Sequence, residues 1–220
     1  MNSQVFKKYQ NSFLGQSCNV FGTGPSLLNY KQNNTHINIG VNEIIYHDIV
    51  MDFYFLADAG NTKRGYRSDP EKYEAYLPKI DKFYRSPDSP CNHAKLPPNS
   101  KRVSYYKTDH LLPFVKTPTP TKVKYIETFS VNLHNFIVDG GSIIFDAMQF
   151  ALYCGFQTIN LIGCDCNYTN GSFYAEKSKC QGKDMMPGWS VMKKFIDKKY
   201  PEVSIITINP VRMDLFNDKV

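Results

Sequence analysis

Small and polar residues directly follow two short apolar stretches that lie far apart in the chain. The turn Gly-Thr-Gly-Pro-Ser at 22–26 follows the short, mainly apolar segment 19–21, and Gly163-Cys164-Asp165 follows the mainly apolar segment 158–162. Glycines at such a turn let a phosphate or a ribose approach the backbone, and a helix that begins there points amides at an anion. Asp165 could orient a sugar hydroxyl or act in catalysis. The alternative interpretations are an ordinary tight turn at 22–26 and a turn-capping carboxylate at Asp165.

A second possible anion site precedes a segment with helical spacing of apolar residues. Gly140-Gly141-Ser142 comes just before that segment and offers backbone amides together with a hydroxyl group. The alternative is that Ser142 simply caps the helix.

Two tyrosines flank an Asn-Gly turn shortly after Asp165. Tyr168 and Tyr174 lie in the stretch YTNGSFYA, which covers residues 168–175. Phenol hydroxyls are neutral at pH 7 and can donate hydrogen bonds to a departing phosphate. The alternative is a hairpin with two packed aromatic rings.

The cysteines do not indicate a metal site. Six cysteines stand at positions 18, 91, 154, 164, 166 and 180, and their spacing includes no paired CxxC motif. The amino-terminal residues have no continuous apolar core, so we expect no signal peptide and no disulfide framework. The longest uncharged run, 147–164, contains Gln, Gly and Asn residues, and we do not expect it to span a membrane.

The elements that would position these residues alternate between strands and helices. We expect strands over 19–21, 35–42, 51–58, 158–162 and 203–208, shorter strands over 82–85 and 102–107, and helices over 70–79, 142–155 and 189–200. Several of these strands are almost continuously apolar, which is typical of a parallel sheet covered on both faces. The sequence therefore predicts a Rossmann-like α/β fold, with ligands bound beyond the carboxyl ends of its strands.

Length and charge limit the other possibilities. The 220 residues predict one domain, 1–220, with 60–135 as an irregular lid or insertion. The 42% hydrophobic and 21% charged residues argue against intrinsic disorder. The net charge of +6 is modest for a nucleic-acid-binding protein. Residues 60–124 hold fourteen Lys and Arg against six acids, so this segment carries the whole positive excess. This basic segment could form a solvated surface, or it could form a surface that faces an anionic acceptor or a membrane.

In their order and rough spacing, these motifs resemble the bacterial lipooligosaccharide sialyltransferases of the Campylobacter type, glycosyltransferase family 42. The matching pieces are Gly-x-Gly-Pro-Ser-Leu, Asn42 at the end of the second strand, a Ser-opened helix ending at Gly155, Leu-x-Gly-x-Asp, and Tyr-x-Asn-Gly-Ser-x-Tyr-Ala. The resemblance covers both ends of the chain and is thin between 60 and 135. More distantly, the chain resembles the MptE-like 6-hydroxymethylpterin pyrophosphokinases, which share the Gly-Pro-Ser-Leu and Gly-x-Asp pieces.

The first resemblance implies a single-domain GT-A-like sialyltransferase fold and a role in lipooligosaccharide biosynthesis. It implies transfer from a CMP-activated sugar donor to a glycan hydroxyl, with no metal and no other cofactor. Asp165 would lie at the edge of the CMP site, and Tyr168 and Tyr174 would hold the leaving phosphate. The residues that would line the CMP site are Gly22, Thr23, Gly24, Asn42, Gly141 and Ser142.

Two positions depart from the family pattern. The family has Asn where this chain has Thr23, and its general-base His before the last helix is missing, because no His follows His134. We expect Asp184, in the matching stretch, to act as the base, for which its carboxylate would need burial. The alternatives that the sequence leaves open are His93, His110 and His134.

Three functions stay open from the sequence. Besides the sialyltransferase-like enzyme, the chain could be a pyrophosphokinase, which normally needs a divalent metal held by carboxylates such as Asp165 and Asp58. It could also be a non-catalytic module that binds a nucleotide or a glycan. We expect a cytoplasmic protein with a nucleotide-sugar donor, a glycan acceptor and no nucleic-acid partner. Contact with the periphery of the inner membrane and homo-oligomerisation stay open.

Overall fold

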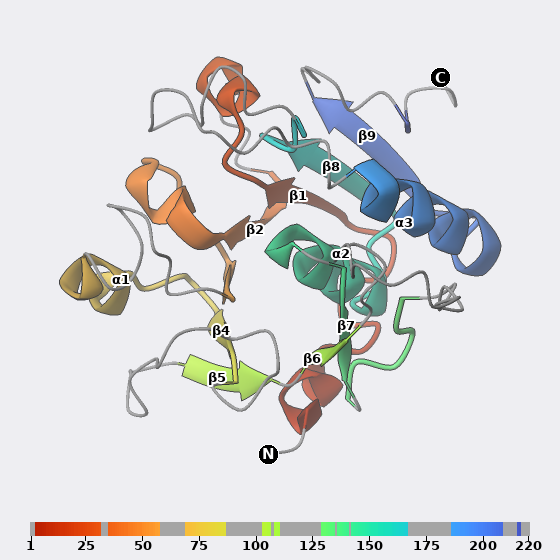
Figure 1. The fold of residues 1–220 in the computed structure, drawn as a ribbon, viewed down its shortest axis with the longest axis horizontal. Helices are drawn as coiled ribbons and strands as arrows, with labels where there is room; N and C mark the ends of the chain where they lie inside the picture. Colours follow the sequence, from red (N-terminus) through yellow and green to blue (C-terminus); the bar gives the residue numbers. More distant parts are fainter. Residues whose placement is uncertain are drawn as a thin grey trace, which may run out of the picture.

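A single parallel sheet of seven strands forms the centre of the molecule (Figure 1). The computed structural model describes residues 3–31, 35–57, 69–86, 103–106, 108–110, 129–134, 136–140, 142–166, 186–208 and 215–216. The strand order is β5-β4-β3-β2-β1-β8-β9, and every neighbouring pair is parallel. The strands are β1 (Ser17–Phe21), β2 (Ile37–Val41), β3 (Phe53–Leu56), β4 (Asp81–Arg85), β5 (Val103–Tyr106), β8 (Thr158–Ile162) and β9 (Ser204–Ile208). The predicted Rossmann-like α/β fold is confirmed.

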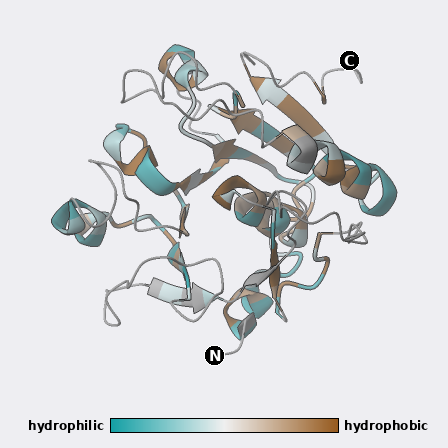
Figure 2. Ribbon diagram, in the orientation of Figure 1, coloured by the Kyte–Doolittle hydropathy of each residue, from teal (hydrophilic) through white to brown (hydrophobic). Residues whose placement is uncertain are grey.

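Helices cover both faces of the sheet because successive strand residues point to opposite sides. On one face, η1 (Ser3–Tyr9), α2 (Ile143–Tyr153) and α3 (Met186–Lys199) pack on residues such as Val20, Phe53 and Phe83. On the other face, η2 (Pro25–Asn29), η3 (Asn42–Tyr46) and α1 (Pro70–Ala75) pack on residues such as Phe21 and Tyr54. The sheet therefore lies between two apolar cores, and brown apolar segments run along its central strands (Figure 2).

Helix α2 is the most buried helix of the fold. All eleven of its residues are buried, and it contacts β1, β2, β3 and β7. Phe150 of α2 lies within 4.9 to 5.6 Å, between ring centroids, of Phe6, Phe53, Phe55 and Phe83. Such a packed helix has little freedom to move, so the residues at its amino end occupy fixed positions.

Part of the segment predicted as a lid or insertion, 60–135, belongs to the main sheet. Strands β4 and β5 lie within it and pair in parallel beside β3. The segment also contributes α1 and β6 (Thr108–His110), and β6 pairs with β7 (Ile137–Asp139) in a separate two-stranded sheet. Most of the remaining positions of 60–135 lie outside the described residues.

Most predicted elements are found within a few residues of their expected bounds. The sequence did not predict the short elements η1, η3, β6 and β7. Within the described residues, no helix is long and apolar enough to cross a membrane.

Candidate functional site

A cavity opens at the carboxyl ends of β1, β2 and β8 and beside the amino end of α2. It is lined by Gly22, Thr23, Val41, Asn42, Ser142, Ile143, Ile144, Gly163, Cys164, Asp165, Cys166 and Trp189. The chain leaves β1 toward β2 on one side, whereas β8 pairs with β1 on the other. This change of direction is where open α/β sheets bind their ligands. Five residues predicted from the sequence thus meet at one cavity, namely Gly22, Thr23, Asn42, Ser142 and Asp165.

The two glycine-containing turns lie against each other beside this cavity. The amide of Gly24 donates a hydrogen bond to the carbonyl oxygen of Gly163 over 2.7 Å. A Cβ atom on Gly22 would lie 2.5 Å from that same oxygen. Gly163 has φ of +66°, and a Cβ atom there would lie 2.7 Å from the carbonyl oxygen of Gly22. The close approach of these turns therefore requires glycine on both sides.

Asp165 joins the two turns through one carboxylate oxygen. Its Oδ2 accepts a hydrogen bond from the amide of Ser26 over 2.7 Å, so the capping interpretation holds for this oxygen. Gly24 packs against the same oxygen, since a Cβ atom there would lie 2.4 Å away, and it is not among the residues that line the cavity. The other oxygen, Oδ1, is buried and has no hydrogen-bond partner among the described residues.

Asn42 has a left-handed backbone at the end of β2. Its φ is +44°, which is unfavourable for residues other than glycine, although asparagine tolerates it better than most. Its carbonyl oxygen accepts a hydrogen bond from the Tyr54 hydroxyl over 2.7 Å. Its side-chain Oδ1 is buried and has no partner among the described residues. The cavity wall thus carries a second buried acceptor without a donor.

Ser142 stands at the cap position of α2 but does not cap it. Its side chain makes no capping hydrogen bond, and Ser142 lines the cavity together with Ile143 and Ile144. The first turn of a helix carries amides without an intrahelical partner and the positive end of the helix dipole. The amino end of α2 and the Ser142 hydroxyl can therefore bind an anion at this wall.

Two thiols and an indole complete the described wall. Burial raises the pKa of the Cys166 thiol to about 12 and raises the pKa of the Cys164 thiol well above its usual range. Both thiols are thus neutral near pH 7, whereas a thiol nucleophile or metal ligand must be ionised. The four described cysteines, Cys18, Cys154, Cys164 and Cys166, are free. Trp189 of α3 also lines the cavity, and sequence reasoning did not assign it a role in the site.

Several residues predicted for the site lie outside the described residues: Gly141, Tyr168, Tyr174 and Asp184, together with His93 and Asp58. His110 ends β6, where its Cα is paired in register with that of Asp139. The Nδ1 atom of His134 lies 3.3 Å from the hydroxyl of Tyr153, at the carboxyl end of α2. The helical rise places that end about 15 Å from the amino end of α2, so His134 is not among the residues that the structure brings to the cavity.

No family model matches the chain, and no curated protein matches it. Within the part of the chain that the structure describes, no group of three or more His, Cys, Asp or Glu side chains could hold a metal ion.

Proposed function

We propose that this chain is a sialyltransferase-like glycosyltransferase, which moves a sugar from a CMP-activated donor to a glycan hydroxyl. One observation carries the proposal. Five residues that the family resemblance assigns to the nucleotide line a single cavity, although they come from four separate segments of the chain. That cavity lies at the edge of the sheet where such folds bind nucleotides.

The unpartnered oxygens favour a ligand that donates hydrogen bonds. Asn42 Oδ1 and Asp165 Oδ1 are buried acceptors, and an acceptor buried without a donor costs free energy. The hydroxyls of a ribose and the amino group of cytosine carry such donors. A cytidine nucleotide would therefore satisfy groups that the described residues leave unsatisfied.

The charges favour one direction for the bound nucleotide. An ionised Asp165 repels a phosphate, whereas the amino end of α2 attracts one. The ribose would thus lie toward Asp165, and the phosphate toward Ser142 and the amino end of α2. We expect Gly22 and Thr23 to pass beneath the nucleotide, with Gly22 held there by its close contact with the Gly163 turn.

The transfer itself rests on residues assigned by the resemblance. The acceptor oxygen forms a bond to the anomeric carbon while the bond from that carbon to the phosphate oxygen breaks. CMP leaves with the bonding electrons, and hydrogen bonds from Tyr168 and Tyr174 stabilise the charge that grows on its phosphate. The acceptor proton passes to Asp184, which we propose in place of the family histidine.

A thermal-shift comparison of CMP, UMP, GDP and ATP, each with and without Mg²⁺, tests this function. A ligand that binds only the folded state raises the melting temperature. We expect CMP to raise it without Mg²⁺ and by more than UMP does, because uracil lacks the amino group. A shift with ATP and Mg²⁺ alone would instead support the pyrophosphokinase. Binding of CMP without transfer from any CMP-linked sugar would support the non-catalytic module.

A further inference from the structure

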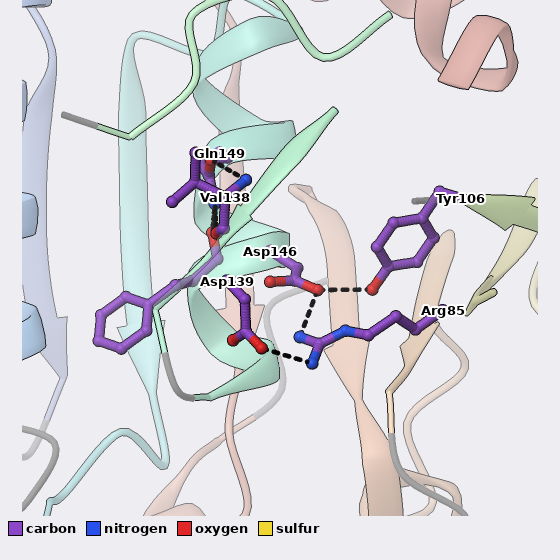
Figure 3. A network of polar contacts seen from close by, with 7 residues as sticks. Arg85, Tyr106, Val138, Asp139, Asp146 and Gln149 are labelled. Carbon is purple, nitrogen blue, oxygen red and sulfur yellow. Dashed lines mark hydrogen bonds and ion pairs between the residues drawn. The ribbon is translucent and has the colours of Figure 1, made fainter. Parts of the chain in front are cut away.

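A buried charged cluster joins β4, β5 and β7 to α2 (Figure 3). Arg85 Nη1 donates to Asp139 Oδ2 over 3.1 Å, and Arg85 Nη2 donates to Asp146 Oδ2 over 2.7 Å. The hydroxyl of Tyr106 donates to the same oxygen of Asp146 over 2.6 Å. Arg85 is 4% exposed, and Asp146 is fully buried. Sequence reasoning did not identify this cluster, and the function proposed above does not use it.

The two carboxylates stand on either side of the turn that leads to the cavity. Asp139 ends β7, and Asp146 lies in the first turn of α2. Ser142, which lines the cavity, lies between them in the chain. A guanidinium group is a rigid fork, and here each of its two terminal nitrogens binds one carboxylate. Arg85 therefore bridges the segments that enter and leave this turn.

A second polar contact holds α2 to β7 one helical turn further along. Gln149 Nε2 donates to the carbonyl oxygen of Val138 over 2.8 Å, and its Oε1 accepts from the amide of Val138 over 3.1 Å. Figure 3 shows both contacts on the same helix. Gln149 fixes the body of α2, whereas Arg85 fixes its first turn and the end of the strand before it.

Burial of such a cluster is a poor way to stabilise a fold. Charges lose their hydration when they are buried, and replacing a buried ion pair by apolar residues is often neutral or stabilising. What a guanidinium fork adds is a defined geometry between the groups that it joins. The cluster is thus suited to setting the position of the amino end of α2.

We propose that Arg85 is a positioning residue for the cavity, which holds the amino end of α2 and Ser142 at the wall through Asp139 and Asp146. The identity of the ligand used in the test rests on the function proposed above. The positioning itself is independent of that function, since it concerns the chain without a ligand.

The test compares three variants of the full chain with a matched control. Arg85→Met removes the fork, and Arg85→Lys keeps the charge but offers one ammonium group in place of two forked donors. The triple variant R85M/D139N/D146N also removes the two negative charges that R85M leaves buried without the Arg85 cation. The control is Lys82→Met, because Lys82 is a second buried cation of β4. Its Nζ donates to the carbonyl oxygen of Tyr73 in α1 over 3.2 Å, so it is held by α1 and not by α2.

Three measurements separate positioning from stability: the melting temperature, the Kd of CMP by calorimetry, and hydrogen exchange of the α2 amides relative to those of β1. We expect R85M and R85K to raise the Kd at least tenfold and to speed α2 exchange at least tenfold. We expect the triple variant to regain the melting temperature that R85M loses, while its Kd stays high. Lys82→Met should lower the melting temperature without raising the Kd of CMP. It should also leave α2 exchange unchanged relative to β1 exchange.

Two results would overturn the proposal. One is a triple variant that regains CMP affinity together with its melting temperature, which is what a purely structural role predicts. The other is an unchanged ratio of α2 to β1 exchange in R85M. If the unsubstituted protein does not bind CMP, the proposed function fails, and the exchange ratio alone then decides whether Arg85 positions α2.

Discussion

Asn42 combines two unfavourable features at one position of the cavity. Its backbone is left-handed, with φ of +44°, and its buried Oδ1 has no donor among the described residues. Cys166, which also lines the cavity, is left-handed too, with φ of +51°. Backbone strain of this kind costs on the order of 1 kcal/mol or more and is concentrated at functional sites. The cavity thus carries strain that the fold alone does not explain.

Replacement of Asn42 by glycine should separate folding from binding. Glycine adopts a positive φ without strain, so we expect the free energy of unfolding to stay the same or to rise by up to about 1 kcal/mol. The loss of Oδ1 should weaken CMP binding by about tenfold, which corresponds to one hydrogen bond. Urea unfolding and calorimetry measure the two effects.

Asn11→Gly is the matched control for this prediction. Asn11 is also left-handed, with φ of +55°, and it lies away from the cavity. It should show the same gain in stability with no change in CMP affinity. An N42G protein that binds CMP as well as the unsubstituted protein would remove Asn42 from the nucleotide site.

Tyr168 and Tyr174 are the residues that we propose to stabilise the leaving phosphate. In the double variant Y168F/Y174F we expect kcat to fall by about 10² or more while the Kd of CMP changes little, because the phosphate charge grows in the transition state. Transfer assays and calorimetry on the same preparation measure both quantities. Tyr200→Phe, just after α3, serves as control. Full turnover in the double variant would return the two residues to the packed-hairpin interpretation.

At the scale of elements, the apolar strands were predictable together with their place in a parallel sheet, whereas β4 was predicted as a short strand but not as part of that sheet. The stretch at 158–162 is apolar apart from Thr158 and Asn160, and it forms β8 as expected. β4 contains Asp81, Lys82 and Arg85, and its membership in the main sheet did not follow from the pattern. Lys82 is buried there because its ammonium group binds carbonyl oxygens of α1 and lies 5.7 Å from the ring centre of Tyr84. Contacts with α1 and with Tyr84 thus reversed the usual preference of a charged residue for the surface.

The site was predictable to the extent that local motifs carry it. Gly22, Asn42 and Asp165 follow strands, and parallel strands bring their carboxyl ends to one edge. Arg85, Asp139 and Asp146 come from three separate elements, and none of them lies in a motif. Their association depends on packing between β4, β7 and α2, for which a single sequence contains no local signal.

The contact between the two glycine turns gives a prediction at the element scale. Gly163→Ala should lower the free energy of unfolding by about 2 kcal/mol or more, because it adds left-handed strain and a Cβ atom 2.7 Å from the Gly22 oxygen. Gly15→Ala is the control, since Gly15 has φ of +74° but nothing within 4 Å of its added Cβ. Gly15→Ala should lower the free energy of unfolding by about 1 kcal/mol, because it adds the left-handed strain alone. Equal losses in the two variants, measured by urea unfolding, would show that the turns can move apart.

At the scale of the whole molecule, α2 connects the two polar sites of the fold. Its amino end lines the cavity, and its first turn carries Asp146 in the buried cluster. Arg85, Tyr106 and Asp139 face Asp146 from β4, β5 and β7. The ionisation of one carboxyl group therefore affects contacts among four elements, and the stability of the protein should depend on it.

Burial raises the pKa of Asp146 to about 6, although the positive charge of Arg85 opposes the shift. The folded protein therefore binds a proton at this site more tightly than the unfolded chain does. Between about pH 4 and 6, the contribution of Asp146 to folding becomes more favourable as the pH falls. Asp146→Asn has no such proton to bind. We compare the free energies of unfolding of the unsubstituted protein and of D146N. The difference between them should shift in favour of the unsubstituted protein by about 2–3 kcal/mol from pH 7.5 to 4. Urea unfolding of both proteins across this range measures the difference.

Asp197→Asn, which removes a half-exposed carboxylate paired with Lys193, should give a nearly constant difference. A constant difference for D146N as well would mean that Asp146 stays ionised throughout, held by Arg85 and Tyr106.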